Sequence, residues 1–468
     1  MFDQHVIGKL KSLTGPKGWL EGADTKRYTE DPRGRIAGVA RLVLRPASVS
    51  EVSEVLRLCN GAGVGIIPFG GGTGGANGHL DPCGQHVVLS LERMNRIRSI
   101  SAQDASITVE AGVKLGDVHN AVDDIGGAFG LSLASEGSCT IGGNLVSNAG
   151  GVQTLRYGNA RDLCLGLEAV MADGSILSGL EPLRKDNTGY DLRHLLIGSE
   201  GTLGVITAAT LKVSPKPKTR ETVVCAVPSP AAALDLLNAL RCQIGEVVSA
   251  FELMSALGMS LALKHFPDLR HPFTQDYPWY VLADVAAPEN IQDKLEAVLA
   301  NALEKGLIED AIVATSGAQA AALWALRENA FEYNRQERVI YSSDTSVPLS
   351  NISAFVSNVQ ESLADWEPSL RVNCYGHVGD GNIHVNVFAV TGAHDAFLES
   401  QPNAASEIAE IIEQTTVSLG GSISAEHGIG RAKIDTLQKY GDPTKLAMMR
   451  RIKQAFDPKG ILNPGALL

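Results

Sequence analysis

Two histidines seven positions apart are the side chains best suited to hold a metal ion. His377 and His384 lie in the stretch GHVGDGNIHVNV, and in an unbroken strand this spacing would place them on opposite faces. Asp380-Gly381 is a strong two-residue turn signal between apolar runs. We therefore expect a hairpin that pairs His377 directly with His384 and leaves Asn386 on the same face.

A metal held by two imidazoles needs a further protein ligand if one position is to stay open for a substrate. Glu426, in the stretch SAEHGIG, is the candidate. Two neutral imidazoles suit Zn, Mn, Fe or Co. The adjacent His427 could then act as a general base, because imidazole exchanges protons near neutral pH. The alternative is that these histidines are hydrogen-bonded core residues without a metal.

Glycine accounts for 49 of the 468 residues, about 10% against a usual ~7%, and it is concentrated in two stretches. In PFGGGTGG, Gly70, Gly72 and Gly75 fit G-x-G-x-x-G, but turn-rich sequence follows where a Rossmann fingerprint needs a helix. Ala76 stands where a P-loop has lysine. Consecutive glycines expose backbone N–H groups that can bind a phosphate. A merely flexible loop is the alternative.

The second glycine stretch, SCTIGGNLVSNAGG, lies about 70 positions further on and mixes glycines with small hydrogen-bonding residues. Such residues allow a backbone to lie close to a ligand. Two such loops favour a long ligand with a central pyrophosphate, such as a dinucleotide.

The elements that must position these groups are strands and helices in alternation. Strands joined by hairpins fill 160–213, and the lysine- and proline-rich segment 214–220 marks a domain boundary. Two strand–helix–strand units follow, from ETVVCAV to VSAFELM and from WYVLADV to DAIVAT. They predict a ferredoxin-like sandwich. The turn-rich tail FDPKGILNPG is expected to rejoin the first domain.

Composition excludes several classes of partner and site. The 40 basic and 52 acidic residues give a net charge of −12, which argues against nucleic acid or an anionic membrane as partner. Seven widely spaced cysteines without a CxxC pair argue against a disulfide scaffold or a thiolate zinc site. No apolar run approaches ~18 residues and the N-terminus lacks a secretory pattern. A cytoplasmic protein without a transmembrane segment is expected.

Seven motifs occur in an order found in one flavoprotein family: PFGGGTGG, SCTIGGNLVSNAGG, RYGNARDLCLGLEAVMADGSIL, GSEGTLGVITAATLKV, GHVGDGNIHVNV, SAEHGIGRAK and FDPKGILNPG. With these motifs the chain resembles, nearly end to end, the FAD-linked D-2-hydroxyacid dehydrogenases of the vanillyl-alcohol oxidase/PCMH superfamily. That family includes D-2-hydroxyglutarate, D-lactate and glycolate-oxidase-subunit branches. The resemblance implies an α+β fold. A two-lobed PCMH-type FAD-binding domain would span 1–216, a ferredoxin-like α+β cap that binds substrate 217–424, and a C-terminal helical segment that completes the FAD domain and active site 425–468.

The resemblance also implies where FAD is bound. Noncovalent FAD is expected, because His79 does not match a flavin-linking histidine. Three groups of residues should contact the cofactor. They are Pro68, Gly70, Gly71, Gly72, Thr73, Gly74 and Gly75 at the pyrophosphate; Ser138, Thr140, Gly142, Gly143, Asn148 and Gly150 at the flavin; and Glu200, Gly201 and Ile206 at the adenine or ribose, with Asn463 closing the site.

The metal and substrate groups follow from the same resemblance. His377, His384 and Glu426 are the implied ligands of a divalent metal, with Zn expected and Mn or Co as alternatives. Arg327 and Asn386 are the implied carboxylate-binding residues and His427 the implied base. On the sequence alone, Arg327 would be a solvated charge on a helix.

The implied reaction is the oxidation of a small D-2-hydroxyacid to the 2-oxoacid. The metal binds the 2-hydroxyl and carboxylate, His427 removes the hydroxyl proton, and hydride passes from C2 to flavin N5. The electrons are expected to pass to an acceptor other than NAD: an electron-transfer flavoprotein, a quinone or a cytochrome. A homodimer is also expected.

Two departures from the family pattern bear on the substrate. Members that act on 2-hydroxyglutarate carry a lysine just before a D-x-S-x-P segment, where this chain has Ser342. They carry a small threonine one helical turn after the arginine, where this chain has Phe331. Loss of a cation and gain of bulk disfavour a second carboxylate. We therefore expect a monocarboxylate substrate, with 2-hydroxyglutarate as one candidate beside lactate-like or less polar 2-hydroxyacids.

Two rival functions stay open on the sequence. One is a flavin transferase like alkylglycerone-phosphate synthase, which shares the flavin fold; the Glu426–His427 pair counts against it. The other is a flavin subunit of a multi-chain glycolate- or lactate-oxidising complex. The complete ligand set indicates that this chain performs its own chemistry, but it does not exclude partner chains.

Overall fold

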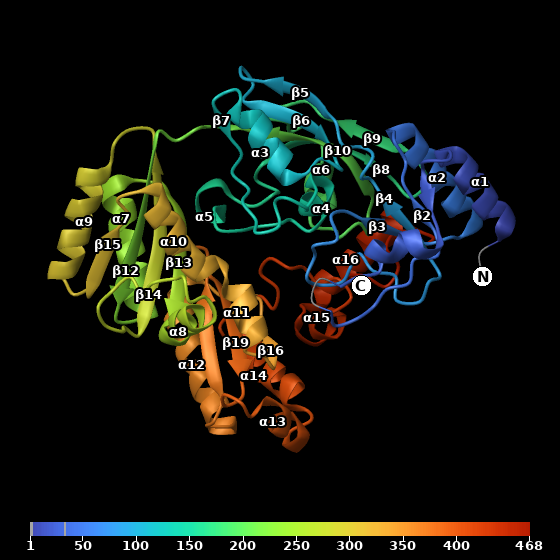
Figure 1. Cartoon of the computed structure of the whole chain (residues 1–468). Helices are drawn as coiled ribbons and strands as arrows, with labels where there is room; N and C mark the ends of the chain where they lie inside the picture. The colour runs from blue at the N-terminus through green and yellow to red at the C-terminus, as the bar shows by residue number, and fades with distance from the viewer. Residues whose placement is uncertain (1–2, 32–33) are drawn as a thin grey trace. The chain divides into compact units, whose positions relative to one another are not determined.

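The computed structural model describes residues 3–31 and 34–468, which fall into two compact units (Figure 1). Unit 1 comprises Met1–Gly150, Gly158–Lys216 and Glu426–Leu468, and unit 2 comprises Gly151–Tyr157 and Pro217–Ala425. Each unit combines helices with sheets, which confirms the predicted α+β class.

The described residues of unit 1 form three sheets. Its strands are β1 (Trp19–Leu20), β2 (Val43–Leu44), β3 (Ile66–Phe69), β4 (Val87–Ser90), β5 (Ile97–Ser101), β6 (Ser106–Glu110), β7 (Gly127–Ala128), β8 (Cys164–Val170), β9 (Ile176–Gly179), β10 (Val205–Lys212) and β11 (Ser214–Pro215). The sheet orders are β1-β2-β4-β3, β5-β6-β10-β8-β9 and β11-β7. The tail lies beside β3, where Leu462 bridges Ile66 and the amide of Asn463 donates to the Ile66 carbonyl oxygen at 2.8 Å.

Helices of unit 1 pack against these sheets through a shared apolar core. The helices of this unit are α1 (Gln4–Thr14), η1 (Gly22–Tyr28), α2 (Val49–Ala62), α3 (Leu115–Asp123), α4 (Ile141–Val146), α6 (Leu192–Leu196), α15 (Ile434–Tyr440) and α16 (Pro443–Phe456). Ser48 caps the start of helix α2: its side chain accepts the Glu51 amide, because a serine oxygen satisfies an otherwise unpaired N–H of the first turn. The helix is capped at its end by Gly63 with φ 67°, a backbone conformation that favours glycine.

Unit 2 is built on one sheet of eight strands. They are β12 (Thr219–Val227), β13 (Val248–Ser255), β14 (Trp279–Ala287), β15 (Asp310–Val313), β16 (Tyr341–Ser342), β17 (Thr345–Ser346), β18 (Arg371–Gly376) and β19 (Asn382–Phe388). The order is β15-β12-β14-β13-β18-β19-β16, with β17 paired to β19. The part β15-β12-β14-β13 has the order of a ferredoxin-like sandwich, as predicted from the two strand–helix–strand units.

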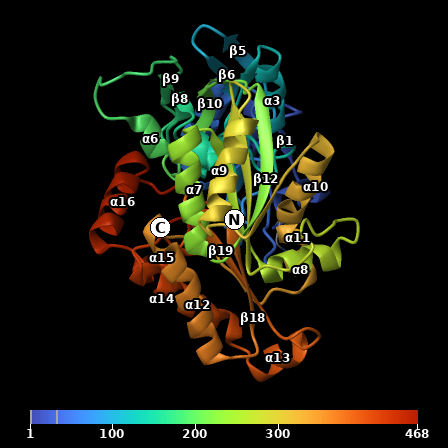
Figure 2. The same cartoon turned by 90° about the vertical axis from the view of Figure 1, so that its left-hand side faces the viewer.

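Helices cover both faces of the unit 2 sheet (Figure 2). They are α5 (Thr154–Tyr157), α7 (Pro230–Ile244), α8 (Ala256–His265), α9 (Gln292–Glu304), α10 (Gly317–Glu328), α11 (Ala330–Gln336), η2 (Leu349–Asn351), α12 (Ile352–Trp366), α13 (His394–Ser400) and α14 (Ala404–Ser418). In β12, Val223 and Cys225 face the core formed with α7, α9, α12 and α14, while Val224 and Ala226 face α8, α10 and α11. Because both faces are covered, the strand is continuously apolar.

The face toward α8, α10 and α11 also carries polar side chains. On β13, Glu252 lies between Ala250 and Met254, and on β19, His384 and Asn386 precede Phe388. Since side chains alternate along a strand, these polar residues share one face of the sheet.

Across the described residues, no helix is both long and apolar enough to cross a membrane.

Candidate active site

The first glycine stretch leaves the carboxyl end of β3 and lies directly against the second. A Cβ added at Gly71 would lie 2.4 Å from the carbonyl oxygen of Ser138, and one at Gly70 would lie 3.0 Å from Thr140 Oγ1 and 3.1 Å from Gly143 Cα. There is no room between these two backbones for a side chain larger than the hydrogen atom of glycine. Close approach of two backbones therefore explains the glycines, and loop flexibility does not.

The short helix α4 begins at Thr140, whose side chain accepts the amide of Gly143. Gly142 lies against Ala111, where an added Cβ would be 2.7 Å from the alanine Cβ. The chain here lines a cleft that brings together six residues predicted to bind FAD: Pro68, Gly70, Thr140, Gly142, Gly143 and Ile206. Residues that the sequence did not indicate also line it, namely Phe69, Leu89, Leu91, Glu92, Ala111, Gly112, Val146, Gly204 and Val205.

Three further predicted cofactor residues adopt a left-handed backbone that is uncommon outside glycine. Asn148, Glu200 and Asn463 have φ of 51°, 53° and 44°. Asn148 accepts the amide of Arg161 at 3.0 Å, and Asn463 donates to the Glu200 carbonyl oxygen at 2.7 Å. These local hydrogen bonds hold the backbone in place. Gly201 (φ 71°) lies against Pro68, with an added Cβ 2.9 Å from the proline Cγ.

The other predicted cofactor residues lie on the same two loops but do not line the cleft. Gly72 has φ 75°, and an added Cβ would lie 2.7 Å from the ring of Phe69. The carbonyl oxygen of Gly75 accepts Arg35 at 2.6 Å, and the Ser138 hydroxyl donates to the Ser135 carbonyl oxygen at 3.2 Å. Thr73, Gly74 and Gly150 complete these loops.

The hairpin that carries the histidines has a different register from the one predicted. Tyr375, and not His377, pairs with His384. Strand β18 ends at Gly376, where φ is 152° and an added Cβ would lie 2.4 Å from the Asn382 carbonyl oxygen. The turn is therefore a longer loop over 377–381, and the two-residue turn at Asp380-Gly381 was a wrong prediction. Asp380 instead accepts the Asn382 amide at 3.2 Å inside that loop.

The two imidazoles are nevertheless neighbours. The ring centroids of His377 and His384 are 6.1 Å apart, and a ligand nitrogen of each lies within 4.8 Å of the other. Nδ1 of His384 is 3.3 Å from the carbonyl oxygen of Ser343. The loop thus brings His377 back beside the strand residue, so the predicted pair survives the change of register.

Glu252 is the charged residue of this cluster that the sequence did not indicate. Its side chain is fully buried, and its carboxylate lies 2.6 Å from His377 Nδ1 and 2.8 Å from Arg327 Nη2. Burial raises the pKa of Glu252, but the charges of His377 and Arg327 outweigh burial and hold it at about 2. The signal was present, because a lone carboxylate in the apolar strand VSAFELM needs a partner.

Arg327 is buried in α10 and is not the solvated charge that the sequence alone suggested. Besides its ion pair with Glu252, its guanidinium lies over the ring of Tyr375 at 4.8 Å. The Tyr375 hydroxyl accepts the side-chain amide of Asn386 at 3.1 Å. One face of unit 2 therefore holds two imidazoles, a guanidinium and a carboxamide around a buried carboxylate.

Glu426 and His427 begin the returning segment of unit 1. Glu426 Oε1 lies 3.4 Å from His427 Nε2. Just before them, the amide of Ala425 donates to the carbonyl oxygen of Asp344 at 3.3 Å. Asp344 follows Ser343, the neighbour of the histidine pair. Glu426 directly follows Ala425 in the sequence, so it stays a candidate for the third metal ligand.

The groups present fit the cofactor and metal that the sequence predicts. Bare backbone at Gly70, Gly71 and Gly142 is suited to close approach by a pyrophosphate. In unit 2, Nδ1 of His377 is held by a carboxylate, so Nε2 is the nitrogen that a metal would use. A carboxylate behind a histidine is a common support of zinc ligands.

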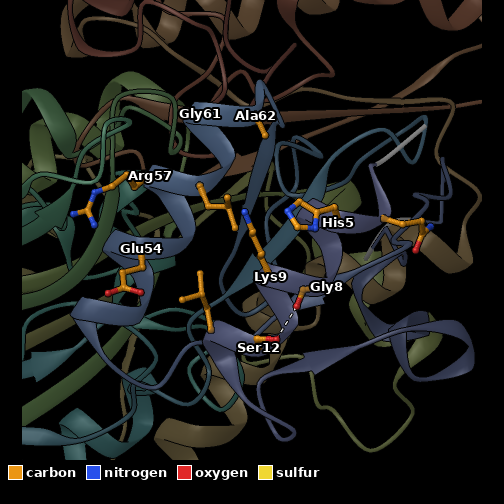
Figure 3. A pocket seen from close by; sticks show the side chains of 11 residues that line it. His5, Gly8, Lys9, Ser12, Glu54, Arg57, Gly61 and Ala62 are labelled. Carbon is orange, nitrogen blue, oxygen red and sulfur yellow. Dashed lines mark hydrogen bonds between the residues drawn. The ribbon is translucent and has the colours of Figure 1, made fainter.

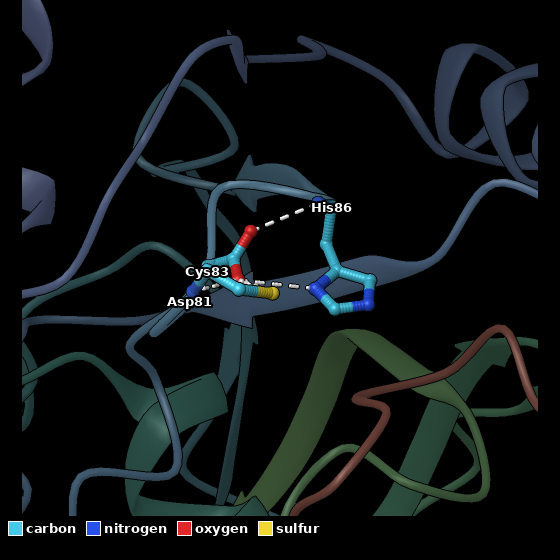
Figure 4. A group of neighbouring side chains, drawn as sticks. All are labelled: Asp81, Cys83 and His86. Carbon is cyan, nitrogen blue, oxygen red and sulfur yellow. Dashed lines mark hydrogen bonds and ion pairs between the residues drawn. The ribbon is translucent and has the colours of Figure 1, made fainter. Parts of the chain in front are cut away.

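Two other features, a surface hollow and a group of possible metal ligands, contain none of the residues predicted to form the site. A broad surface hollow lies between α1 and α2 and is lined by residues such as His5, Lys9 and Arg57 (Figure 3). Asp81, Cys83 and His86 form a second group of possible metal ligands (Figure 4). There, the Asp81 carboxylate accepts the backbone amides of Cys83 and His86 at 3.1 and 2.8 Å. These hydrogen bonds close a turn, and the turn explains why the three side chains lie together.

Comparison with known families matches the chain in two blocks. Residues 40–179 match the family described as FAD binding domain, and residues 216–467 match the family described as FAD linked oxidases, C-terminal domain.

Curated relatives extend over nearly the whole chain. A D-2-hydroxyglutarate dehydrogenase of Xanthomonas citri pv. viticola is 36% identical, covering 100% of this chain and 97% of its own. The mitochondrial D-2-hydroxyglutarate dehydrogenase of Bos taurus is 39% identical, covering 92% and 78%. A putative mitochondrial D-lactate dehydrogenase of Schizosaccharomyces pombe is 33% identical, covering 98% and 88%.

Solved structures share the fold at low identity. p-Cresol methylhydroxylase with substrate bound has a TM-score of 0.76 at 17% identity, covering 99% of this chain and 96% of its own. An alkyldihydroxyacetonephosphate synthase has a TM-score of 0.74 at 18% identity, covering 99% and 85%. These likenesses confirm the predicted PCMH-type fold.

Proposed function

The chain belongs to the FAD-linked oxidases and is an FAD-dependent hydroxyacid dehydrogenase, and we propose that it oxidises a D-2-hydroxyacid with the help of a divalent metal. The observation that carries the proposal is the cluster on one face of unit 2, where Glu252 joins His377 to Arg327. A metal ligand and a carboxylate-binding cation are fixed by the same buried group.

Each side chain has a distinct task in this proposal. Arg327 and Asn386 bind the C1 carboxylate, a role that the two-pronged guanidinium suits. His427 takes the proton of the 2-hydroxyl at its ring nitrogen. When bound, FAD supplies the acceptor for the hydride of C2.

His377, His384 and Glu426 would hold the metal, with Zn favoured and Mn or Co as alternatives. Two imidazoles and one carboxylate leave room for substrate oxygens. The ion supplies Lewis-acid chemistry that makes the substrate hydroxyl easier to deprotonate. The support for this set is the closeness of the two imidazoles and the carboxylate behind His377.

The relatives and the residues of this chain favour different side chains for the substrate. The curated relatives named for D-2-hydroxyglutarate favour a second carboxylate. Ser342 and Phe331 favour the opposite, because neither supplies a cation and phenylalanine adds bulk where the family has a small threonine. We propose a monocarboxylate, such as a lactate-like or less polar 2-hydroxyacid.

The electron acceptor is proposed to be an electron-transfer flavoprotein, a quinone or a cytochrome. We also propose a homodimer and a cytoplasmic location. The rival transferase has the support of a shared fold alone, at 18% identity, whereas dehydrogenases reach 39%.

A substrate panel tests this proposal. Turnover with an artificial acceptor should be found for D- but not L-2-hydroxyacids, should be lost with EDTA and should return with Zn or Mn. Elemental analysis should find one ion per chain. The double substitution His377→Ala and His384→Ala should abolish both the turnover and the binding of the ion. Activity that survives this substitution would rule out the metal site. Highest kcat/KM on D-2-hydroxyglutarate or D-malate would overturn the monocarboxylate assignment.

A further inference from the structure

We propose that Glu200 is a positioning residue, which fixes the loop that carries His427 by binding two consecutive backbone N–H groups just beyond it. The proposal rests on the role of His427 as base. It gives Glu200 a task different from the FAD contact that the sequence predicted. All the residues involved lie in unit 1.

The loop after His427 forms a small anion-binding concavity. Gly428 and Gly430 have positive φ, 75° and 53°, which lets the neighbouring amides converge. The amide of Ile429 donates to Glu200 Oε1 at 2.7 Å and that of Gly430 to Oε2 at 2.6 Å. Successive N–H groups that converge on one anion form a nest, a motif that often binds phosphate. Here a carboxylate of the chain itself occupies it.

Both glycines are required at their positions. A Cβ added at Gly428 would lie 2.7 Å from Glu200 Oε1, and one added at Gly430 would lie 2.0 Å from the carbonyl oxygen of Ala76. The same carbonyl oxygen accepts the amide of Arg431 at 2.9 Å. The loop is thus held on one side by a carboxylate and on the other by the end of the first glycine stretch.

Glu200 is itself held in a fixed place. Its amide donates to the carbonyl oxygen of Val146 at 2.8 Å, and its carbonyl oxygen accepts Asn463 at 2.7 Å. Asn463 in turn accepts the guanidinium of Arg431 at 3.0 Å. Glu200, the nest, Arg431 and Asn463 therefore form a closed ring of hydrogen bonds.

This ring connects the base-bearing loop to the cofactor cleft. Val146 lines that cleft, and Pro68, which also lines it, contacts Gly201 next to Glu200. Because both carboxylate oxygens already accept amides at short distances, the carboxylate serves the loop. The consequence is that the loop 428–430, which follows His427 directly, is held in one position in unit 1.

Glu200→Gln tests the assignment, because the amide retains one acceptor and turns a donor toward the second N–H. A displacement of about 1 Å can cost about 100-fold in rate. We expect flavin reduction by substrate in the FAD-loaded variant to slow by about 10- to 100-fold, with a changed pH profile. The FAD content of the purified protein should match the wild type. Hydrogen exchange at the amides of Ile429 and Gly430 should accelerate.

The matched control is Glu110→Gln, which changes a buried glutamate of the same unit in the same way. Glu110 accepts the amide and guanidinium of Arg96 at 3.0 and 2.9 Å and the guanidinium of Arg98 at 3.4 Å, and both arginines lie outside the loop 428–431. It should lose stability without slowing flavin reduction. If Glu200→Gln does not fold, Gly428→Ala should reproduce the slow reduction by pushing the carboxylate away.

The outcomes separate this proposal from the proposed function. Unchanged exchange at Ile429 and Gly430, or unchanged reduction in a loaded variant, would overturn the positioning role. A variant that loses FAD but is reduced at the normal rate once reloaded would do the same and would restore the predicted cofactor contact. If no D-2-hydroxyacid reduces the wild type, the proposed function fails. The exchange measurement still decides whether Glu200 fixes the loop.

Discussion

Glu252→Gln is expected to weaken binding of the metal more than it weakens binding of FAD. The substitution keeps the shape of the side chain but removes the charge that faces both His377 Nδ1 and Arg327 Nη2, at 2.6 and 2.8 Å. The amide oxygen can accept from one of them. The other must face an NH₂ group or lose its partner, in a place where Glu252 is 0% exposed.

The size of the effect follows from that geometry. Loss of the group that supports a metal-binding histidine costs about 10- to 100-fold in metal affinity, which is about 1.4 to 2.8 kcal/mol at about 1.4 kcal/mol per factor of ten. Arg327, with 9% of its surface exposed, also loses its buried counter-charge. Arg327 should then be less well ordered and bind the substrate carboxylate more weakly, so the KM for the substrate should rise together with the Kd for the metal.

The assay is a zinc titration against a competing chelator, with the metal content read by elemental analysis. Glu337→Gln is the matched control, because the Glu337 side chain in unit 2 is only 4% exposed and is paired with a histidine at 2.7 Å and an arginine at 2.9 Å. Both variants should lose stability, but only Glu252→Gln should lose metal affinity. Equal zinc Kd values in Glu252→Gln and the wild type would refute the assignment of His377 as a supported ligand.

Three further predictions concern the cofactor loops, the substrate and pH. Gly71→Ala should lower the FAD content measured by absorbance, because its Cβ would lie 2.4 Å from the Ser138 carbonyl oxygen, whereas Gly137→Ala, with nothing within 4 Å, should retain FAD. Ser342→Lys should raise kcat/KM for D-2-hydroxyglutarate relative to D-lactate, and a fall would contradict the proposed side-chain selectivity. Burial raises the pKa of Glu337 but its cationic partners hold it at about 2, below the ~4.3 of an unfolded glutamate. The stabilisation is therefore complete above that value and lost as pH falls toward 2. Urea unfolding should show a larger deficit for Glu337→Gln at pH 7 than at about pH 3, and an equal deficit would refute the linkage.

The fold was predictable where the pattern of apolar residues is strong. Two strand–helix–strand units gave the ferredoxin-like order, because strands such as β12 are apolar on both faces. The glycine stretches indicated a close approach of backbones, and the structure supplies the opposing carbonyl oxygen of Ser138 against Gly71. Neither conclusion needed knowledge of long-range pairing.

Register and charge pairing were not predictable in this way. Asp380-Gly381 favours a two-residue turn locally, but the strand ends earlier, since Gly376 crosses close to the Asn382 carbonyl oxygen. Glu252 acquires its role only when β13 lies beside β18 and α10 packs against the sheet. Residues 125 positions apart then meet, and no local pattern specifies such a contact.

The most direct test of the central claim is anaerobic mixing of the purified, FAD-loaded chain with a D-2-hydroxyacid. We expect the visible flavin absorption band to bleach with one equivalent of 2-oxoacid formed per FAD, the L-enantiomer to leave it unchanged, and His427→Ala to slow the bleaching severely. A flavin that stays oxidised with every D-2-hydroxyacid, in protein that contains both FAD and metal, would contradict the account.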